Sequence, residues 1–244
     1  MTPYQIMGET WSPDRRRRFA DEQADRHNQL RREGFKVLPS VPAAAIDEVV
    51  KALGQPPVRD GLIDRWSTDF ILAQPLLKAI AFRPDVILEA AMHIGAIPRI
   101  LDVSLWQTNP GDGGDPAAQK WHRDMDDWRA CKLFVYLTDV GPKQGPHMFV
   151  PGSHRAEFFD VRGWAPDRFF TQAGRGLDAT IDAIPHFEMQ GAAGMTFLEN
   201  TYCFHRGKPV EEGHRIIFQV CYGLMEIETM LSGTMIPSIR AAWG

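Results

Sequence analysis

The sequence predicts a mainly β fold with flanking helices, of the α+β class, in which a sandwich or jelly roll follows a helical N-terminal part. From about residue 99, short apolar runs of strand length alternate with turns rich in Gly, Pro, Asn and Asp, which is typical of all-β folds. Before that point helical patterning dominates. A chain of 244 residues, 44% of them hydrophobic, can bury a substantial core, so we expect one domain over residues 1–244.

Residues 1–98 are predicted to be mostly helical with one early strand. Ser12 starts a polar segment as a helix cap would, and Gly34 ends it. The strand FKVLPSV follows, and apolar residues then recur at helical spacing. The expected elements are a helix at 12–32, a strand at 35–41, a helix at 43–53 and helical patterning over 68–92.

Residues 99–224 are predicted to form the jelly-roll core. The strand candidates are RILDVSLWQT, CKLFVYLTDV, HMFVPGS, GMTFLENTYCFH and HRIIFQVCYGL. We expect the last two runs to form a hairpin around residues 207–213. In a hairpin symmetric about Val210, His205 and Arg215 would lie opposite one another on a common face.

Two further segments complete the predicted organisation. Residues 155–193 are long, mixed and Gly-rich without a clear period, and such a segment inside a compact domain often covers a functional site. We therefore expect a lid-like insertion there. Residues 225–244 are expected to form a C-terminal tail.

The composition favours chemistry on a small molecule. A formal net charge of −4 argues against nucleic-acid binding and against a polybasic membrane surface. The most apolar stretch, residues 70–82, is too short to span a membrane, and the N-terminus lacks a secretory signal, so we expect a cytoplasmic protein. The three cysteines have no CxxC spacing and are expected to be reduced and buried.

The stretch WHRDMDDW, residues 121–128, holds the first candidate site. His122 and Asp124 are two residues apart, so in extended backbone both side chains leave the same face. A second histidine would complete the triad that holds iron(II) with coordination positions left open, and His205 is the best candidate. Without that third ligand, the pair also fits a hydrogen-bonded turn. The neighbouring Asp126 and Asp127 are expected to be solvated or helix-capping.

Arg215 lies ten residues after His205 in a predicted core strand. A guanidinium that points into an apolar barrel is costly unless it meets an anion, and its planar fork suits a carboxylate. The pattern therefore implies a dicarboxylate cosubstrate.

The order HxD, distal His, and Arg ten residues on resembles the iron(II)- and 2-oxoglutarate-dependent dioxygenases. More specifically, WHRD, YLTDV, GPHMFVPGSH and HRGKPVEEGHR resemble the phytanoyl-CoA dioxygenase family. HxD alone is a weak signal, but these motifs in this order are specific. The resemblance covers about residues 35–224. It implies that the core is a double-stranded β-helix, the cupin-like form of the jelly roll.

The resemblance also implies roles for individual residues. His122, Asp124 and His205 would be the iron ligands, and Arg215 would bind the distal carboxylate of 2-oxoglutarate. Gly207 stands where many relatives have a Ser or Thr that helps to bind this carboxylate. The remaining candidates are Asn109, Gln119 and Phe134 for the cosubstrate pocket, and Trp128, Arg129 and Trp106 for the substrate.

Three of these candidates have an alternative interpretation. Trp106 and Phe134 also fit core packing, because aromatic side chains fill barrel interiors. Arg129 fits a salt-bridge partner for the nearby aspartates as well as a substrate clamp.

The implied reaction uses iron(II), 2-oxoglutarate and O2 to hydroxylate an unactivated C–H bond of a small molecule, with release of succinate and CO2. Halogenating relatives replace the carboxylate ligand by a small residue, so Asp124 favours hydroxylation. One alternative is a zinc or other divalent-metal hydrolase, against which Arg215 argues. Another is a non-catalytic jelly roll that binds a metal.

Overall fold

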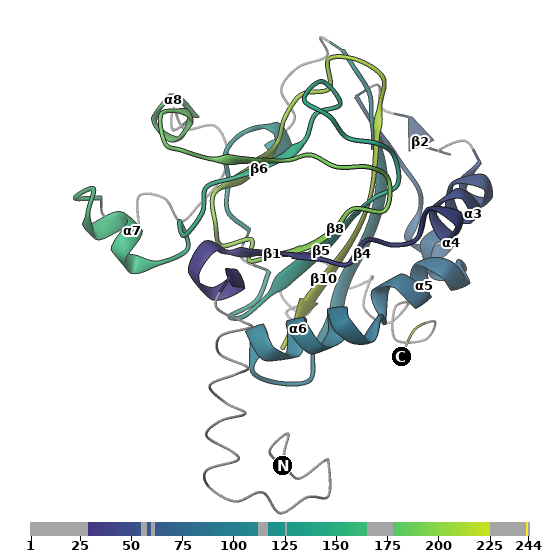
Figure 1. Cartoon of the computed structure of the whole chain (residues 1–244), viewed down its shortest axis with the longest axis horizontal. Helices are drawn as coiled ribbons and strands as arrows, with labels where there is room; N and C mark the ends of the chain where they lie inside the picture. Colours follow the sequence, from purple (N-terminus) through teal and green to yellow (C-terminus); the bar gives the residue numbers. More distant parts are fainter. Residues whose placement is uncertain are drawn as a thin grey trace, which may run out of the picture.

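The computed structural model describes residues 29–54, 58–59, 62–111, 117–124, 126–164, 178–224 and 243. Two antiparallel β-sheets face one another, and helices lie outside the larger sheet (Figure 1). This arrangement confirms the predicted jelly-roll core with flanking helices.

Within the described residues, the larger sheet has seven strands, all paired antiparallel. Its order is β1 (Phe35–Leu38), β8 (Thr196–Glu199), β5 (Cys131–Tyr136), β10 (Arg215–Gly223), β4 (Arg99–Thr108), β3 (Ile63–Arg65) and β2 (Val58–Arg59).

The smaller sheet has three strands, in the order β7 (Phe187–Met189), β6 (His147–Phe149) and β9 (His205–Gly207). A single bridge between His122 and His205 adds the chain around His122 to its edge. The interior between the sheets is lined largely by aromatic side chains, because alternate strand residues point inward. The buried members of this interior cluster are Phe35, Phe134, Tyr136, Val140, Phe149, Met189, Phe197 and Ile217.

The helices cover the outer face of the larger sheet. They are α3 (Ala43–Leu53), α4 (Thr68–Leu72), α5 (Pro75–Ala81) and α6 (Pro84–Ile94). One buried cluster joins them to the sheet, with Ile46, Leu77 and Val86 from the helices beside Leu133 and Phe218 from the strands. This shared core supports one domain, which stays a prediction.

The helical pattern predicted over 68–92 is divided into three helices. Pro75 and Pro84 each stand at the start of a new helix. Proline is accepted there because its missing N–H would have no helical partner, whereas inside a helix it breaks the hydrogen-bond ladder.

The N-terminal part contains more strand than predicted. β2 and β3 pair with one another, and β3 extends the larger sheet beside β4. The expectation of one early strand was therefore wrong. Strands of two and three residues are too short for a period-two pattern to reveal them.

The predicted hairpin between His205 and Arg215 does not form. β9 pairs with β6, whereas β10 pairs with β4 and β5 in the other sheet. The run GMTFLENTYCFH likewise divides into β8 and β9, because the chain turns where the Asn200 side chain accepts a hydrogen bond from the Tyr202 backbone N–H. His205 and Arg215 consequently belong to opposite sheets.

The insertion expected at 155–193 contains α7 (Ala156–Asp160), α8 (Asp178–Asp182) and β7. Its last part is therefore a strand of the smaller sheet, which the irregular sequence did not predict. Residues 165–177 lie outside the described residues, as do 12–28 of the predicted polar helix and all of the predicted tail except Trp243. All three cysteines are free and buried, as expected. Among the described helices, none is long and apolar enough to cross a membrane.

Replacement of Tyr222 by Phe tests the attachment of the helical layer. The Tyr222 hydroxyl donates to the Ala81 carbonyl at 2.6 Å, and both residues are buried. Tyr222→Phe leaves that carbonyl without this partner and should lower the free energy of unfolding by about 1 kcal/mol. Urea denaturation measures the change, and an unchanged midpoint would contradict the expected contribution.

Candidate active site

Backbone pairing brings the three predicted metal ligands together. His122 and His205 exchange two backbone hydrogen bonds of 3.0 Å, and the Asp124 N–H donates to the Thr201 carbonyl at 2.9 Å. One ligand atom from each of His122, Asp124 and His205 lies within 4.8 Å of the other two. The Nε2 atoms of His122 and His205 lie 3.6 and 3.4 Å from the two carboxylate oxygens of Asp124.

Both imidazoles are oriented by their other ring nitrogen. His122 Nδ1 donates to the Lys120 carbonyl at 2.7 Å, and His205 Nδ1 donates to the Cys203 carbonyl at 2.9 Å. A carbonyl only accepts, so Nδ1 carries the proton and Nε2 is the nitrogen that can bind a metal. Burial and the neighbouring His205 lower the pKa of His122 to about 4, which keeps its imidazole neutral at pH 7.

Asp124 shares a salt bridge with a buried lysine. Lys132 Nζ lies 2.6 Å from Asp124 Oδ2 and 3.0 Å from Asp126 Oδ2. Burial would raise the pKa of Asp124, but His205 and Lys132 outweigh it and lower this pKa well below the ordinary value. Lys132 therefore holds one carboxylate oxygen and leaves Oδ1 for a metal.

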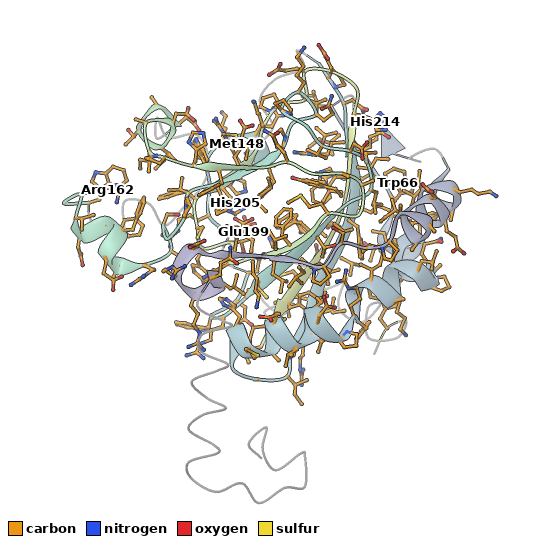
Figure 2. The ribbon with its side chains drawn as sticks, viewed as in Figure 1. Trp66, Met148, Arg162, Glu199, His205 and His214 are labelled. Carbon is orange, nitrogen blue, oxygen red and sulfur yellow. The ribbon has the colours of Figure 1, made fainter. Side chains whose placement is uncertain are left out.

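A buried histidine–carboxylate contact lies behind His205. His147 Nε2 contacts the Glu199 carboxylate, and Glu199 Oε1 lies 3.9 Å from His205 Nδ1. Figure 2 shows His205 and Glu199 next to one another in the interior. Burial by itself would lower the pKa of His205, but Glu199 and Asp124 raise it to about 9.

Arg215 points into the same interior from β10 and is buried. Its only described hydrogen bond is a long one, 3.4 Å, from Nη2 to the Thr108 hydroxyl, and its Nε and Nη1 have no partner among the described residues. Burial lowers the pKa of Arg215, and no described carboxylate opposes this. Such an orphaned guanidinium fits a carboxylate ligand.

The expected cosubstrate residues lie in different surroundings. Phe134 is in the interior, where its ring centroid lies 4.7 Å from that of His147. Gln119 belongs to a short 3-10 turn, Ala117–Gln119, that contacts β9. The Asn109 amide donates to Asp64 at 2.8 Å and accepts from Gln107, so its described partners belong to β3 and β4 rather than to the triad.

The three residues expected to contact the substrate lie in two different places. Trp106 packs against the interior aromatic cluster. Trp128 and Arg129 instead line a surface pocket beside the triad. Arg129 forms no ion pair with the nearby aspartates, which removes the salt-bridge interpretation for the part of the chain that the structure describes.

Asp127 is only 2% exposed and accepts from the backbone N–H of Leu224 and of Trp128, so the expectation of a solvated or helix-capping side chain was wrong.

Lys132, His147 and Glu199 belong to the site but were not assigned to it from the sequence. A usable signal existed, because Lys132 alternates with Phe134 and Tyr136 on the inward face of an apolar strand. A charged residue in such a position needs a buried counter-ion.

The donor set of the triad fits iron(II). Two imidazole nitrogens and one carboxylate on one side of a site form the facial arrangement that leaves positions open for cosubstrate and oxygen. The orphaned guanidinium of Arg215 in the same interior matches a dicarboxylate that would also reach the metal.

Solved structures with this fold include enzymes that use 2-oxoglutarate. The α-ketoglutarate-dependent epimerase SnoN from nogalamycin biosynthesis is 18% identical, with a TM-score of 0.62 over 84% of each chain. EctD from S. alaskensis, solved with 2-oxoglutarate and 5-hydroxyectoine, is 20% identical, with a TM-score of 0.61 over 82% of this chain and 75% of its own. HygX from Streptomyces hygroscopicus, solved with nickel and 2-oxoglutarate, is 19% identical, with a TM-score of 0.57 over 83% and 86%.

The sequence comparison identifies the family. No curated protein shows a significant match to this chain. The model of the phytanoyl-CoA dioxygenase (PhyH) family matches residues 11–215, which include all three triad residues and Arg215. The chain belongs to the phytanoyl-CoA dioxygenase family and is a 2-oxoglutarate-dependent dioxygenase that uses iron(II) and O2.

Proposed function

We propose that this enzyme hydroxylates an unactivated C–H bond of a small molecule, with release of succinate and CO2, and that His122, Asp124 and His205 hold its iron. The supporting observation is the convergence of three ligand atoms within 4.8 Å in a barrel whose interior also holds a buried arginine, Arg215, with two nitrogens that have no partner among the described residues. When bound, iron(II) with 2-oxoglutarate and O2 supplies the oxidant that removes a hydrogen atom from the substrate. The cytoplasmic location stays a prediction.

Hydrogen bonds orient the proposed ligand side chains without a bound metal. The backbone carbonyls of Lys120 and Cys203 accept hydrogen bonds from the two Nδ1 atoms, so Nε2 is the metal-facing nitrogen of both histidines. His122 is already neutral at pH 7, whereas His205, with a pKa of about 9, would release its Nε2 proton when the metal binds. Lys132 donates a hydrogen bond to Asp124 Oδ2, which favours metal binding through the other oxygen, Oδ1. A ligand set that is already ordered loses little conformational freedom on binding, which strengthens binding.

Arg215 would anchor the distal carboxylate of 2-oxoglutarate. Its Nε and Nη1 can form the paired hydrogen bonds that a carboxylate accepts, and the Thr108 hydroxyl lies beside Nη2. Gly207 leaves space for this group, because an added Cβ would lie 3.0 Å from Nη2. The hydroxyl that relatives carry at the Gly207 position therefore has a local counterpart in Thr108.

The oxidative outcome is tested by product analysis. Similar folds include an epimerase and a carbocyclase, so cofactor use alone does not define the product. Turnover under 18O2 should place one labelled oxygen atom in the product, as hydroxylation requires. A product that has lost hydrogen or inverted a stereocentre without gaining oxygen would contradict hydroxylation while leaving the triad intact.

The cofactor site is tested by anaerobic addition of iron(II) and 2-oxoglutarate to the full-length protein. The chelate should give a weak visible charge-transfer band. A protein that gives no band and binds zinc tightly instead would contradict the proposal.

Replacement of Arg215 by Leu should raise the KM for 2-oxoglutarate about 10- to 100-fold, because a charge-assisted carboxylate contact contributes about 1.5–3 kcal/mol. Steady-state succinate release measures this change. Arg155→Leu is the matched control, since Arg155 is exposed and pairs with Glu157 outside the site. A KM that stays at the wild-type value in Arg215→Leu would remove this residue from the cosubstrate site.

A further inference from the structure

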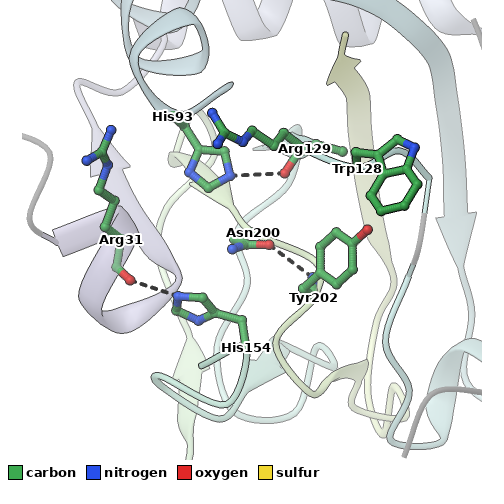
Figure 3. A pocket seen from close by; sticks show the side chains of 8 residues that line it. Arg31, His93, Trp128, Arg129, His154, Asn200 and Tyr202 are labelled. Atoms are coloured by element: carbon green, nitrogen blue, oxygen red, sulfur yellow. Dashed lines mark hydrogen bonds between the residues drawn. The ribbon is translucent and has the colours of Figure 1, made fainter. Parts of the chain in front are cut away.

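A surface pocket of about 360 Å³ lies beside the triad and has no role in the cofactor site described above. None of the three metal ligands lines it, and neither does Arg215. Figure 3 shows its lining residues, which come from distant parts of the chain. They are Arg31, His93, Trp128, Arg129, Ala130, His154, Asn200 and Tyr202.

The pocket is connected to the proposed metal ligands through the backbone. Its residues Asn200 and Tyr202 flank Thr201, whose carbonyl accepts from the Asp124 N–H. The segment that contains these residues, 200–204, leads directly into His205. Trp128 and Arg129 belong to the segment that follows directly after Asp124. A molecule in this pocket would therefore lie at the end of the barrel that carries the triad.

The pocket is cationic. No carboxylate lines it, and neither Arg31 nor Arg129 forms an ion pair with any carboxylate in the described ranges. Each guanidinium donates one hydrogen bond to a carbonyl near the end of α6, Arg31 to Met92 at 3.4 Å and Arg129 to Ile94 at 3.1 Å. These bonds fit capping of a helix C-terminus, but a guanidinium has five donors, so most of them stay available.

Two neutral side chains also line the pocket, the amide of Asn200 as a hydrogen-bond donor and the indole of Trp128 as an apolar surface. Asn200 uses its amide oxygen to accept from Tyr202, which leaves its NH2 group as a donor. Trp128 is 82% exposed, although an indole normally gains by burial. The indole lies across the pocket from Arg31, and the Arg129 guanidinium lies between them near His93 (Figure 3). A pocket with an apolar surface on one side and cations on the other suits a ligand that combines a flat apolar part with an anion.

We propose that this pocket binds the acidic group of the substrate, a carboxylate or phosphate held by Arg31 and Arg129, with an adjoining flat or apolar portion against Trp128. This inference rests on the proposed function, because it places the acidic group beside the triad so that a neighbouring C–H bond faces the metal. It restricts the substrate class to oxyanion-bearing small molecules.

Binding of phenyl phosphate tests the pocket. The full-length enzyme is loaded anaerobically with iron(II) and saturating 2-oxoglutarate, so that Arg215 is already occupied, and is titrated calorimetrically. Phenyl phosphate should bind and benzyl alcohol, which is neutral, should not. Arg31→Gln and Arg129→Gln should each raise the Kd about tenfold or more, as expected for a lost hydrogen bond to a charged group. Arg155→Gln should leave the Kd unchanged.

Trp128→Ala tests the apolar part separately. It should weaken the binding of phenyl phosphate and leave that of methyl phosphate unchanged. Binding of benzyl alcohol as tight as that of phenyl phosphate, no binding of either, or wild-type Kd values in both arginine variants would overturn the proposal.

Succinate release links the pocket to the substrate. Phenyl phosphate in the substrate position should change the rate of succinate release measured without another substrate, and Arg129→Gln should lose this change. A constant rate despite arginine-dependent binding would overturn the assignment to the substrate. The charge-transfer band, recorded before each titration, tests the proposed function alone, so a normal band without phosphate binding would contradict only the pocket.

Discussion

Replacement of Asp124 by Ala is expected to reduce succinate release to background and to remove the visible charge-transfer band. Asp124 supplies the only carboxylate of the candidate metal site that it forms with His122 and His205 in the described chain. Without it, only two imidazoles of the protein would hold the metal and no protein carboxylate would be bound to the dication. Anaerobic titration with iron(II), followed by succinate quantification, measures both effects.

Asp126→Ala is the matched control for this variant. Asp126 contacts the same Lys132 nitrogen, at 3.0 Å rather than 2.6 Å, but does not belong to the metal cluster. Both variants remove one of two carboxylates from the same lysine, so a general effect on folding should appear in both. Loss of the band only in Asp124→Ala supports the ligand role, and undiminished succinate production by that variant would refute it.

Replacement of Lys132 by Met is expected to lower both the stability of the metal-free protein and its affinity for the metal. Lys132 is 7% exposed, and its removal takes the lysine cation from both Asp124 and Asp126, which leaves Asp124 with the two triad histidines as its charged or chargeable partners. Breaking a buried ion pair costs about 3–5 kcal/mol, and we expect the lower end because both carboxylates keep partial contact with solvent. Loss of a group that orients a metal ligand typically lowers affinity about 10- to 100-fold.

Two controls separate these effects of Lys132. Lys143→Met removes an exposed lysine paired with Glu212 and should change stability by less than about 1 kcal/mol. Lys132→Arg keeps the cation and should recover part of the metal affinity. Denaturant unfolding with and without iron(II), together with metal competition, provides the readouts. A Lys132→Met protein that is less stable but binds iron(II) with wild-type affinity would rule out positioning of Asp124.

The pattern of neighbouring residues was enough to predict several parts of the site. His122 and Asp124 are two residues apart, and the structure brings both to His205. Arg215 was expected to be buried with an unmet need for an anion, and its guanidinium is buried with two nitrogens unpaired. The prediction that His205 and Arg215 meet through a hairpin was wrong, since β9 and β10 belong to different sheets.

The buried partners of the site were not predicted. Lys132 meets Asp124, and His147 meets Glu199, across 8 and 52 residues of sequence. The two members of each pair do not belong to one strand or helix, so no period along a single element predicts their contact. The inward-facing charge of Lys132 was visible in the alternation of β5, but the choice of its counter-ion depended on where the two sheets meet.

The sequence by itself determined the fold class and predicted the three residues of the candidate metal triad and a need for an anion at Arg215. These properties follow from alternation along a strand and from the cost of burying a charge, which are local or belong to one residue. Only the tertiary structure decided which sheet carries each strand, which buried charges meet, and where Arg31 and Arg129 form one pocket. Such contacts join segments far apart in the chain, and the packing of the two sheets and the outer helices selects them.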